Sequence, residues 1–367
     1  MRPHQSFALL CLLLASATIL SACGSNLPSH VTESKTTVPT NVPSQTLPLK
    51  ANGRQSLGYY TGSTDSWQSI QLFADQLTIV SADVYAIDAD GKISGSDPYN
   101  VAAFDRDHGI LTFACVSNYN SDLGDFDPKL AEVGIVTYKE ETITALVDLA
   151  ASGGYDGVNI DFESIHYSED IESDRAAFTG FIDDLAGQLH AKGLKLIISV
   201  PAKTSDNPAD DWSYPFNLAA LGQKADYLQV MTYDEHGPWS EPGAVSGADW
   251  VENVLIYSIA IVDPAKLLIG LPAYGYDWTS DGSNDSVTWK DAPALLSKMG
   301  AESHWDETTQ SPWLTYTEND ISHTLWYENG QSISAKARLV NKYNLGGWSV
   351  WALGYDNADF WKAVFTN

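Results

Sequence analysis

The sequence predicts an α/β protein, a (β/α)8 TIM barrel with a small α+β insertion. Two patterns predict the barrel. Eight short apolar segments alternate with amphipathic stretches, and most of the eight are apolar on both faces. Strands of that kind are typical of a parallel sheet covered on each side. A doubly wound open sheet is the alternative, but it usually carries a Gly-rich phosphate loop after its first strand, and we find no such loop.

The eight predicted strands are short runs rich in apolar, β-branched and aromatic residues. In chain order they occupy residues 56–62, 77–88, 109–119, 157–163, 194–202, 226–234, 266–276 and 346–354. Three stretches between them repeat apolar residues at helical spacing, over 139–154, 172–193 and 332–347. In the second of these, we predict Ser173 as the N-cap and Gly193 as the C-terminal stop.

The segment between the seventh and eighth strands breaks the alternation. Residues 277–330 contain "DAPALLSKMG" and then "SPWLTYTENDISHTLWYENG". The second piece is typical of a β-hairpin with "END" near its turn. We therefore predict a small α+β module inserted into the barrel.

The first 53 residues differ in composition from the rest. An apolar run from Phe7 to Leu20 is too short to span a membrane comfortably and is followed by "LSAC", which ends at Cys23. The pattern resembles a bacterial lipoprotein signal, with an ordinary cleaved signal as the alternative. We therefore predict a signal peptide over 1–23, lipid on Cys23 and contact with a membrane surface through it. The Ser/Thr/Pro-rich stretch 24–53 is predicted to be a disordered tether, and 54–367 the barrel.

The composition of the chain limits which binding partners and disulfide bonds can be expected. The chain has 20 Lys and Arg against 47 Asp and Glu, a formal net charge of −27. Such a surface repels the phosphate backbone, so no nucleic-acid partner is expected. Cys11 and Cys23 fall in the signal, which leaves Cys115 without a disulfide partner and predicted to be a small buried apolar side chain. We expect a monomer.

The most informative stretch is "YDGVNIDFES", residues 155–164, in the fourth predicted strand. Residues i and i+2 of a strand share a face, so Asn159, Asp161 and Glu163 point one way, into the barrel. Burying a carboxyl group without a partner is costly, and two close carboxyls raise the pKa of one of them. The pair is therefore predicted to provide a general acid and the group that tunes it. A purely structural pair, or one that binds a cation, is the alternative.

Several motifs together resemble one enzyme family. "DGVNIDFE" (156–163) resembles the DGxDxDxE signature of family 18 glycoside hydrolases, which are chitinase-like (β/α)8 enzymes. "SLGYYTG", "VMTYD" (230–234), "KLLIGLPAYGY" and "GGWSVWALGYD" (346–356) resemble the first, sixth, seventh and eighth strands of that family. Asn159 departs from the signature, which has Asp there. This departure and "WYENGQSISAK" (326–336) resemble the branch that contains spore-germination and cell-wall glucosaminidases.

The resemblance implies a mechanism and a set of site residues. The 2-acetamido oxygen of the substrate attacks the anomeric carbon, and the configuration is retained. Glu163 is then the acid and later the base, Asp161 holds the acetamido N–H, and Tyr233 bonds the acetamido carbonyl. The remaining residues implied to contact the substrate are Asn159, Asp234, Trp351 and Tyr59. The implied partner is a polysaccharide of β-1,4-linked N-acetylglucosamine, in peptidoglycan or chitin. Trp67, Trp212, Trp239 and Trp278 fall near predicted strand ends and are candidates to line a glycan groove.

Other functions have less support in the sequence. A carbohydrate-binding protein without catalysis is one alternative, although such relatives usually lose the acidic Glu, which is present here as Glu163. An envelope scaffold that merely keeps the barrel is another. We find no H-E-x-x-H motif or paired Cys for zinc and no G-x-S-x-G elbow, so no metal or cofactor is expected.

Overall fold

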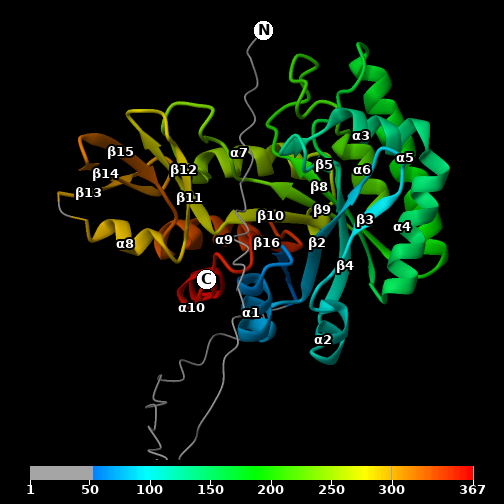
Figure 1. The fold of residues 1–367 in the computed structure, drawn as a ribbon, viewed down its shortest axis with the longest axis horizontal. Helices are drawn as coiled ribbons and strands as arrows, with labels where there is room; N and C mark the ends of the chain where they lie inside the picture. Colours follow the sequence, from blue (N-terminus) through cyan, green and yellow to red (C-terminus); the bar gives the residue numbers. More distant parts are fainter. Residues whose placement is uncertain (1–52, 299, 367) are drawn as a thin grey trace, which may run out of the picture.

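The computed structural model describes residues 53–298 and 300–366. The predicted signal peptide, Cys23 and nearly all of the predicted tether lie outside the described residues. Eight parallel strands pair in the order β1-β16-β10-β9-β8-β7-β4-β2, and β2 pairs back with β1 to close the ring (Figure 1). They are β1 (Gln55–Tyr60), β2 (Ile79–Ile87), β4 (Leu111–Ser117), β7 (Gly157–Asp161), β8 (Lys195–Pro201), β9 (Tyr227–Met231), β10 (Leu267–Pro272) and β16 (Gly347–Trp351). The predicted (β/α)8 barrel is confirmed.

Helices connect the barrel strands and pack around them. They are α1 (Thr64–Phe73), α2 (Val101–Asp107), α4 (Lys139–Gly153), α5 (Ile171–Ala191), α6 (Leu218–Lys224), α7 (Ala248–Ile259), α9 (Gly330–Lys342) and α10 (Ala358–Phe365). Shorter elements decorate the loops: η1 (Ala74–Gln76), β3 (Ile93–Gly95), β5 (Tyr119–Asn120), β6 (Asp125–Phe126), α3 (Pro128–Glu132), η2 (Val133–Thr137) and η3 (Pro264–Lys266). Among the described residues, no helix has the length and apolar character that a membrane crossing requires.

One predicted helix boundary is wrong. The N-cap of α5 is Asp170, three residues before the predicted Ser173. The Asp170 carboxylate accepts hydrogen bonds from the backbone N–H groups of Glu172 and Ser173, and the Ser173 hydroxyl also donates to it at 2.7 Å. Both residue types cap helices well, so the local pattern did not choose between them. The predicted stop is confirmed, because Gly193 follows the helix with a φ of +74°.

The interior of the barrel has an apolar part and a polar part. Leu57, Ile79, Phe113, Ile197 and Leu268 form a buried apolar cluster that includes Tyr59 and Cys115. The polar part of the interior consists of hydrogen-bonded side chains from five strands: Ser81, Asn159, Ser199, Gln229 and Ser349. All of them are buried. The outer side of the strands packs against the helices, and Phe162 stacks on Phe181 of α5 with ring centroids 6.0 Å apart.

The insertion forms a separate antiparallel sheet in the order β12-β11-β15-β14-β13. Its elements are β11 (Tyr274–Thr279), β12 (Asp285–Thr288), α8 (Ala292–Leu296), β13 (Glu302–Asp306), β14 (Ser311–Glu318) and β15 (Ile321–Trp326). Figure 1 shows this module beside the barrel, to its left. The hairpin turns at Asn319 and Asp320, both at positive φ, as the "END" motif indicates. The sheet begins at Tyr274 rather than 277, because β11 continues from β10 after a single residue.

Candidate active site

Five of the predicted site residues lie at the mouth of the barrel, the end at which the strands finish. Asp161 is the last residue of β7 and Glu163 follows two residues later. Tyr233 and Asp234 follow the end of β9, and Trp351 is the last residue of β16. The charges of Asp161 and Glu163 both act on the Tyr233 phenol, and those of Asp161 and Asp234 act on Glu163. The structure therefore brings together residues that are far apart in the sequence.

The main chain of Glu163 is held by Asn118, a residue that the sequence analysis missed. The Glu163 N–H donates to Asn118 Oδ1 at 2.8 Å, and Asn118 Nδ2 donates to the Glu163 carbonyl at 2.8 Å. Asn118 is buried and also donates to the Asp127 carbonyl at 3.0 Å. This double contact fixes the loop after β7, where Ser164 has a φ of +51°. The signal was the position of Asn118 directly after an apolar strand.

The environment of the two carboxyl groups keeps Glu163 protonated. Burial raises the pKa of Glu163 well above its usual range, and the negative charges of Asp161 and Asp234 raise it further. Burial also raises the pKa of Asp161, to about 6, while a hydrogen bond from Ser199 opposes that rise. In the described part of the chain, none of these three carboxyls makes an ion pair. The arrangement therefore favours the protonated form of Glu163 beside an Asp161 that loses its proton more readily.

Asp234 is tied to the insertion module. Its Oδ1 atom accepts hydrogen bonds from the Tyr274 hydroxyl at 2.6 Å and the Tyr276 hydroxyl at 3.0 Å, both on β11. Burial raises the pKa of Asp234 and these two bonds oppose the rise. Asp234 also has a φ of +62°, a backbone conformation that Asp tolerates better than most residues. The tyrosine pair was visible in "PAYGY" as two aromatic residues on one face of a strand, but its partner was not.

Asn159 lies deeper than Asp161 and uses both ends of its amide. Nδ2 donates to the Tyr59 hydroxyl at 3.0 Å and to Ser81 Oγ at 2.9 Å. Its Oδ1 lies 3.3 Å from Ser199 Oγ. Tyr59 is only 1% exposed. Asn159 and Tyr59, predicted to contact substrate, are therefore both buried in the polar interior of the barrel.

Trp351 forms an aromatic wall at the mouth. Its ring packs on Tyr59 with centroids 5.3 Å apart and the planes tilted by 56°. It also packs, half-buried, against the cluster of Val245, Tyr274, Tyr276 and Trp278. An aromatic face held in this way is suited to contact with the apolar face of a sugar ring.

The four other candidate tryptophans differ in position. Trp278 is buried and donates to the carbonyls of Gly237 and Ser240, so it is a packing residue. Trp67 stacks on Tyr99 and packs against the core. Trp212 and Trp239 are 42% and 56% exposed. Trp239 packs edge-on against Tyr276, which bonds Asp234, and so lies next to the site.

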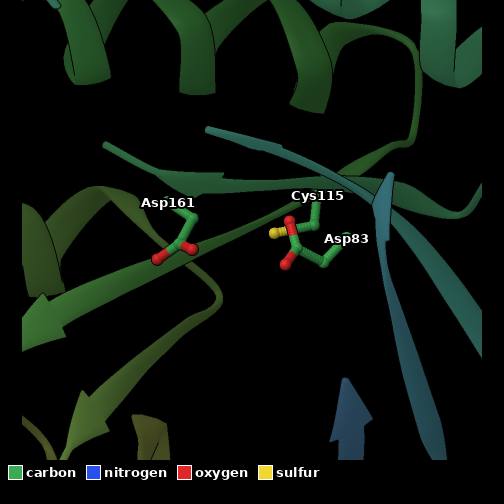
Figure 2. A group of neighbouring side chains, drawn as sticks. All are labelled: Asp83, Cys115 and Asp161. Carbon is green, nitrogen blue, oxygen red and sulfur yellow. The ribbon is translucent and has the colours of Figure 1, made fainter. Parts of the chain in front are cut away.

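A further group of neighbouring side chains, half-buried at Asp83 and buried at Cys115 and Asp161, was not predicted. Asp83 of β2, Cys115 of β4 and Asp161 of β7 each have a ligand-type atom within 4.8 Å of the other two (Figure 2). The signal was present in "LTIVSADVYAID", where Ser81 and Asp83 alternate on one face of an apolar strand. Cys115 is a buried free thiol, as predicted. Burial raises the pKa of that thiol well above its usual range, so it keeps its proton and is a poor metal ligand.

These features define a class of protein. A carboxylic acid that stays protonated beside a second carboxyl group can protonate a glycosidic oxygen. The C-terminal end of barrel strands is where (β/α)8 enzymes place their chemistry. The fold and the site are those of a glycoside hydrolase.

The comparisons with known proteins identify the family. Residues 55–356 match glycosyl hydrolases family 18, and the chain belongs to that family. It is 37% identical over 320 residues to YvbX of Bacillus subtilis (strain 168), described as an uncharacterized glycosylase, across 86% of this chain and 91% of YvbX. It is 29% identical over 231 residues to the cortical fragment-lytic enzyme of the same organism, across 61% of this chain and 52% of that protein. The resemblance to family 18 and to its spore-germination branch is confirmed.

A solved structure supports the same family assignment. A chitinase from Chromobacterium violaceum ATCC 12472 superposes with a TM-score of 0.80 at 38% identity, across 85% of this chain and 98% of that one. The barrel and its insertion are therefore shared along nearly the whole of that enzyme.

We predict that the folded state loses stability as the pH rises from about 4 to about 7. Burial raises the pKa of Asp83 and of Asp105 to about 7 and that of Asp161 to about 6. Between the unfolded and folded pKa values the folded chain binds more protons, so each increase in pH favours unfolding. Surface carboxylates with lowered pKa values, such as Asp281 at about 2, act below this window. Thermal unfolding across pH 3–8 measures the effect.

Asp105→Asn supplies the matched comparison. Asp105 lies on α2, where its Oδ2 accepts from Thr112 Oγ1 at 2.8 Å and its Oδ1 is unpartnered. The amide keeps the Thr112 bond and removes the ionisation, so the variant should gain up to about 4 kcal/mol relative to wild type between pH 4 and pH 8. A wild-type stability that climbs through this range, or a variant with an unchanged slope, would contradict the account.

Proposed function

We propose that this glycoside hydrolase cleaves β-1,4-linked N-acetylglucosamine glycans, of peptidoglycan or chitin type, by substrate-assisted retaining catalysis. The observation that carries the proposal is the meeting of Glu163, Asp161 and Tyr233 at one end of the barrel, where burial and neighbouring charges raise the pKa of Glu163. The relatives support the substrate class, since one is named a cortical fragment-lytic enzyme and another a chitinase.

The first step breaks the glycosidic bond. Glu163 donates its proton to the leaving glycosidic oxygen as the acetamido oxygen of the substrate forms a bond to the anomeric carbon. A positively charged oxazolinium ion results. The Asp161 carboxylate accepts the acetamido N–H and stabilises that charge, and the Tyr233 hydroxyl donates to the acetamido oxygen to hold it in line. Burial raises the pKa of Tyr233 well above its usual range, so the phenol keeps the proton that it donates.

The second step restores the enzyme. Glu163, now ionised, takes a proton from water, and the hydroxide oxygen opens the oxazolinium ring at the anomeric carbon. Two inversions give overall retention. Trp351 supports the reacting sugar, and the exposed Trp239 extends the aromatic surface toward neighbouring sugars.

Glu163→Gln tests the role of the acid. The amide is the same size but holds no transferable proton, so kcat should fall by roughly 10²–10⁴-fold while glycan binding is kept. Hydrolysis and binding are measured on chitin oligomers and on purified peptidoglycan. Glu169→Gln is the matched control, because Glu169 is exposed in the loop after β7 and should tolerate the change.

The outcomes separate three functions. Turnover by wild type that disappears in Glu163→Gln supports the enzyme mechanism. Binding of glycan without turnover by wild type identifies a carbohydrate-binding protein, and the absence of both identifies a scaffold. Equal rates for wild type and Glu163→Gln would remove Glu163 from the mechanism.

The acetamido group provides a second prediction. Oligomers whose acetamido groups are replaced by free amines should not be cleaved, because the nucleophile is gone. Tyr233→Phe should lower kcat on the acetylated oligomer by roughly 10²-fold through loss of one donor. The first-formed product should have the β configuration by NMR. An α product, or cleavage of the deacetylated oligomer at the acetylated rate, would refute substrate assistance.

We also propose that the chain is exported and anchored by lipid at Cys23, on the strength of the apolar run and "LSAC". Cys23→Ser removes the thiol that would carry the lipid, and the protein should then leave the membrane fraction in cells of the source type. Recovery of both forms in the same fraction would reject the anchor. Activity of the released protein should be unchanged, because 54–367 holds the barrel.

A further inference from the structure

We propose that Asp83 is a positioning residue of the reaction: it holds the proton that leaves Asp161 ionised beside Glu163. This inference rests on the proposed function for the roles of Asp161 and Glu163. Asp83 belongs to no motif that the sequence resemblance covers, and its proximity to Asp161 emerges only from the closed barrel.

The strand register brings Asp83 into the interior of the barrel. Asp83 on β2 pairs with Cys115 on β4, which pairs with Asn159 on β7, so the three lie at one level. The register then shifts between Asp83 and Tyr85, which leaves Val84 as the extra residue of a bulge. Tyr85 consequently faces outward, where its hydroxyl meets that of Tyr155 at 2.8 Å.

Asp83 is the carboxyl group that shares a small volume with Asp161. Figure 2 shows the Asp83 carboxyl beside the Cys115 thiol, with the Asp161 carboxyl across from that thiol. One oxygen of each carboxyl and the sulfur lie within 4.8 Å of one another, and the thiol hydrogen-bonds Asp83. Asn159 cannot take this part, because its amide is neutral and already bonded to Tyr59, Ser81 and Ser199.

Two carboxyl groups this close in a buried site favour a state with one proton between them. Burial raises the pKa of Asp83 to about 7, and the charge of Asp161 raises it further. Asp161, with a pKa near 6, has the Ser199 hydroxyl to stabilise its anion. The proton therefore stays on Asp83 while Asp161 ionises.

No cationic side chain among the groups named below alters which of Asp83 and Asp161 holds the proton. The titratable side chains around the pair are Cys115 on β4, Glu163 after β7, Tyr59 on β1 and Tyr233 after β9. Their neutral forms are all favoured by burial. Within residues 53–298 and 300–366, neither Asp83 nor Asp161 makes an ion pair.

This arrangement serves two needs of the reaction. An ionised Asp161 can accept the acetamido N–H and can keep Glu163 protonated. A protonated Asp83 prevents the second negative charge that would repel Asp161 within the interior. Ionisation of Asp83 at higher pH adds to the charges that raise the pKa of Glu163.

The first test needs no hydrolysis. Thermal unfolding is followed from pH 3 to 9 for wild type, Asp83→Asn, Asp161→Asn and the double variant. Removal of the Asp161 charge should move the Asp83 step in stability to lower pH, by roughly one unit. The effects of the two substitutions should be non-additive above pH 7. Asp105→Asn, a buried carboxyl on α2, should combine additively with Asp161→Asn.

Additive effects of Asp83→Asn and Asp161→Asn would overturn the proposal. If Asp83→Asn fails to fold, Asp161→Asn alone tests the proposal. The pH at which stability changes as Asp83 ionises must then be lower in Asp161→Asn than in wild type, and an unchanged pH overturns the proposal. This result does not depend on turnover. A wild type that lacks hydrolysis would therefore remove the proposed function and leave the proton-sharing pair to be judged by unfolding.

The second test is the pH profile of kcat/KM on the cleaved oligomer. Asp83→Asn cannot ionise, so Glu163 should lose one source of repulsion and the alkaline limb should move down by roughly 0.5–1 pH unit. Asn159→Asp in the Asp83→Asn background returns a carboxyl beside Asp161 and should restore the limb. Asp105→Asn should leave the limb in place. An unchanged limb in Asp83→Asn, or a limb that moves equally in Asp105→Asn, would overturn the proposal.

Discussion

The site depends on one constraint: carboxyl groups are buried or half-buried at the mouth of the barrel without a cation to pair them. Asp161, Glu163 and Asp234 make no ion pair among the described residues. Desolvation of a charge costs more than a few hydrogen bonds return, so such groups prefer to keep protons. The raised pKa values follow directly, and they favour the protonated form that the proposed acid requires. A nearby Lys or Arg would lower those values and remove the proton that the chemistry needs.

The same chain treats its structural carboxylates differently. Asp174 accepts from the backbone N–H groups of Tyr167 and Ser168 and from the Ser168 hydroxyl, and holds the loop after β7 on α5. Asp356 accepts from Ser69, the Gly354 N–H and the Trp361 indole. The Glu163 carboxyl makes no hydrogen bond to any residue of the described ranges. Hydrogen-bond donors therefore surround the carboxylates that hold the fold, whereas the side chain proposed to transfer a proton has none in the described part of the chain.

The sequence predicted what depends on residues close together along the chain. The short apolar runs located all eight strands, and the alternation of Asn159, Asp161 and Glu163 located the inner face of β7. Asn118 and Asp83 were missed because their roles depend on contacts across strands. The register between β2 and β7 follows from closure of the ring and from a bulge at Val84, and neither appears in a single sequence. Ser173 was misassigned because two good caps lie within three residues.

The barrel interior also explains how an amide at position 159 is compatible with a carboxyl pair. Residues i and i+2 on one strand are separated by roughly 6.5–7 Å of backbone rise. Asp83, on a strand two places away, brings an oxygen within 4.8 Å of one on Asp161, so charge at that position acts on Asp161 at short range. Position 159 is then free for a group that both donates and accepts, which an ionised carboxylate cannot do. Asn159 can therefore donate to Tyr59 and Ser81 while its Oδ1 lies 3.3 Å from Ser199 Oγ, which holds the interior in register, and the proposed shared proton resides on another strand.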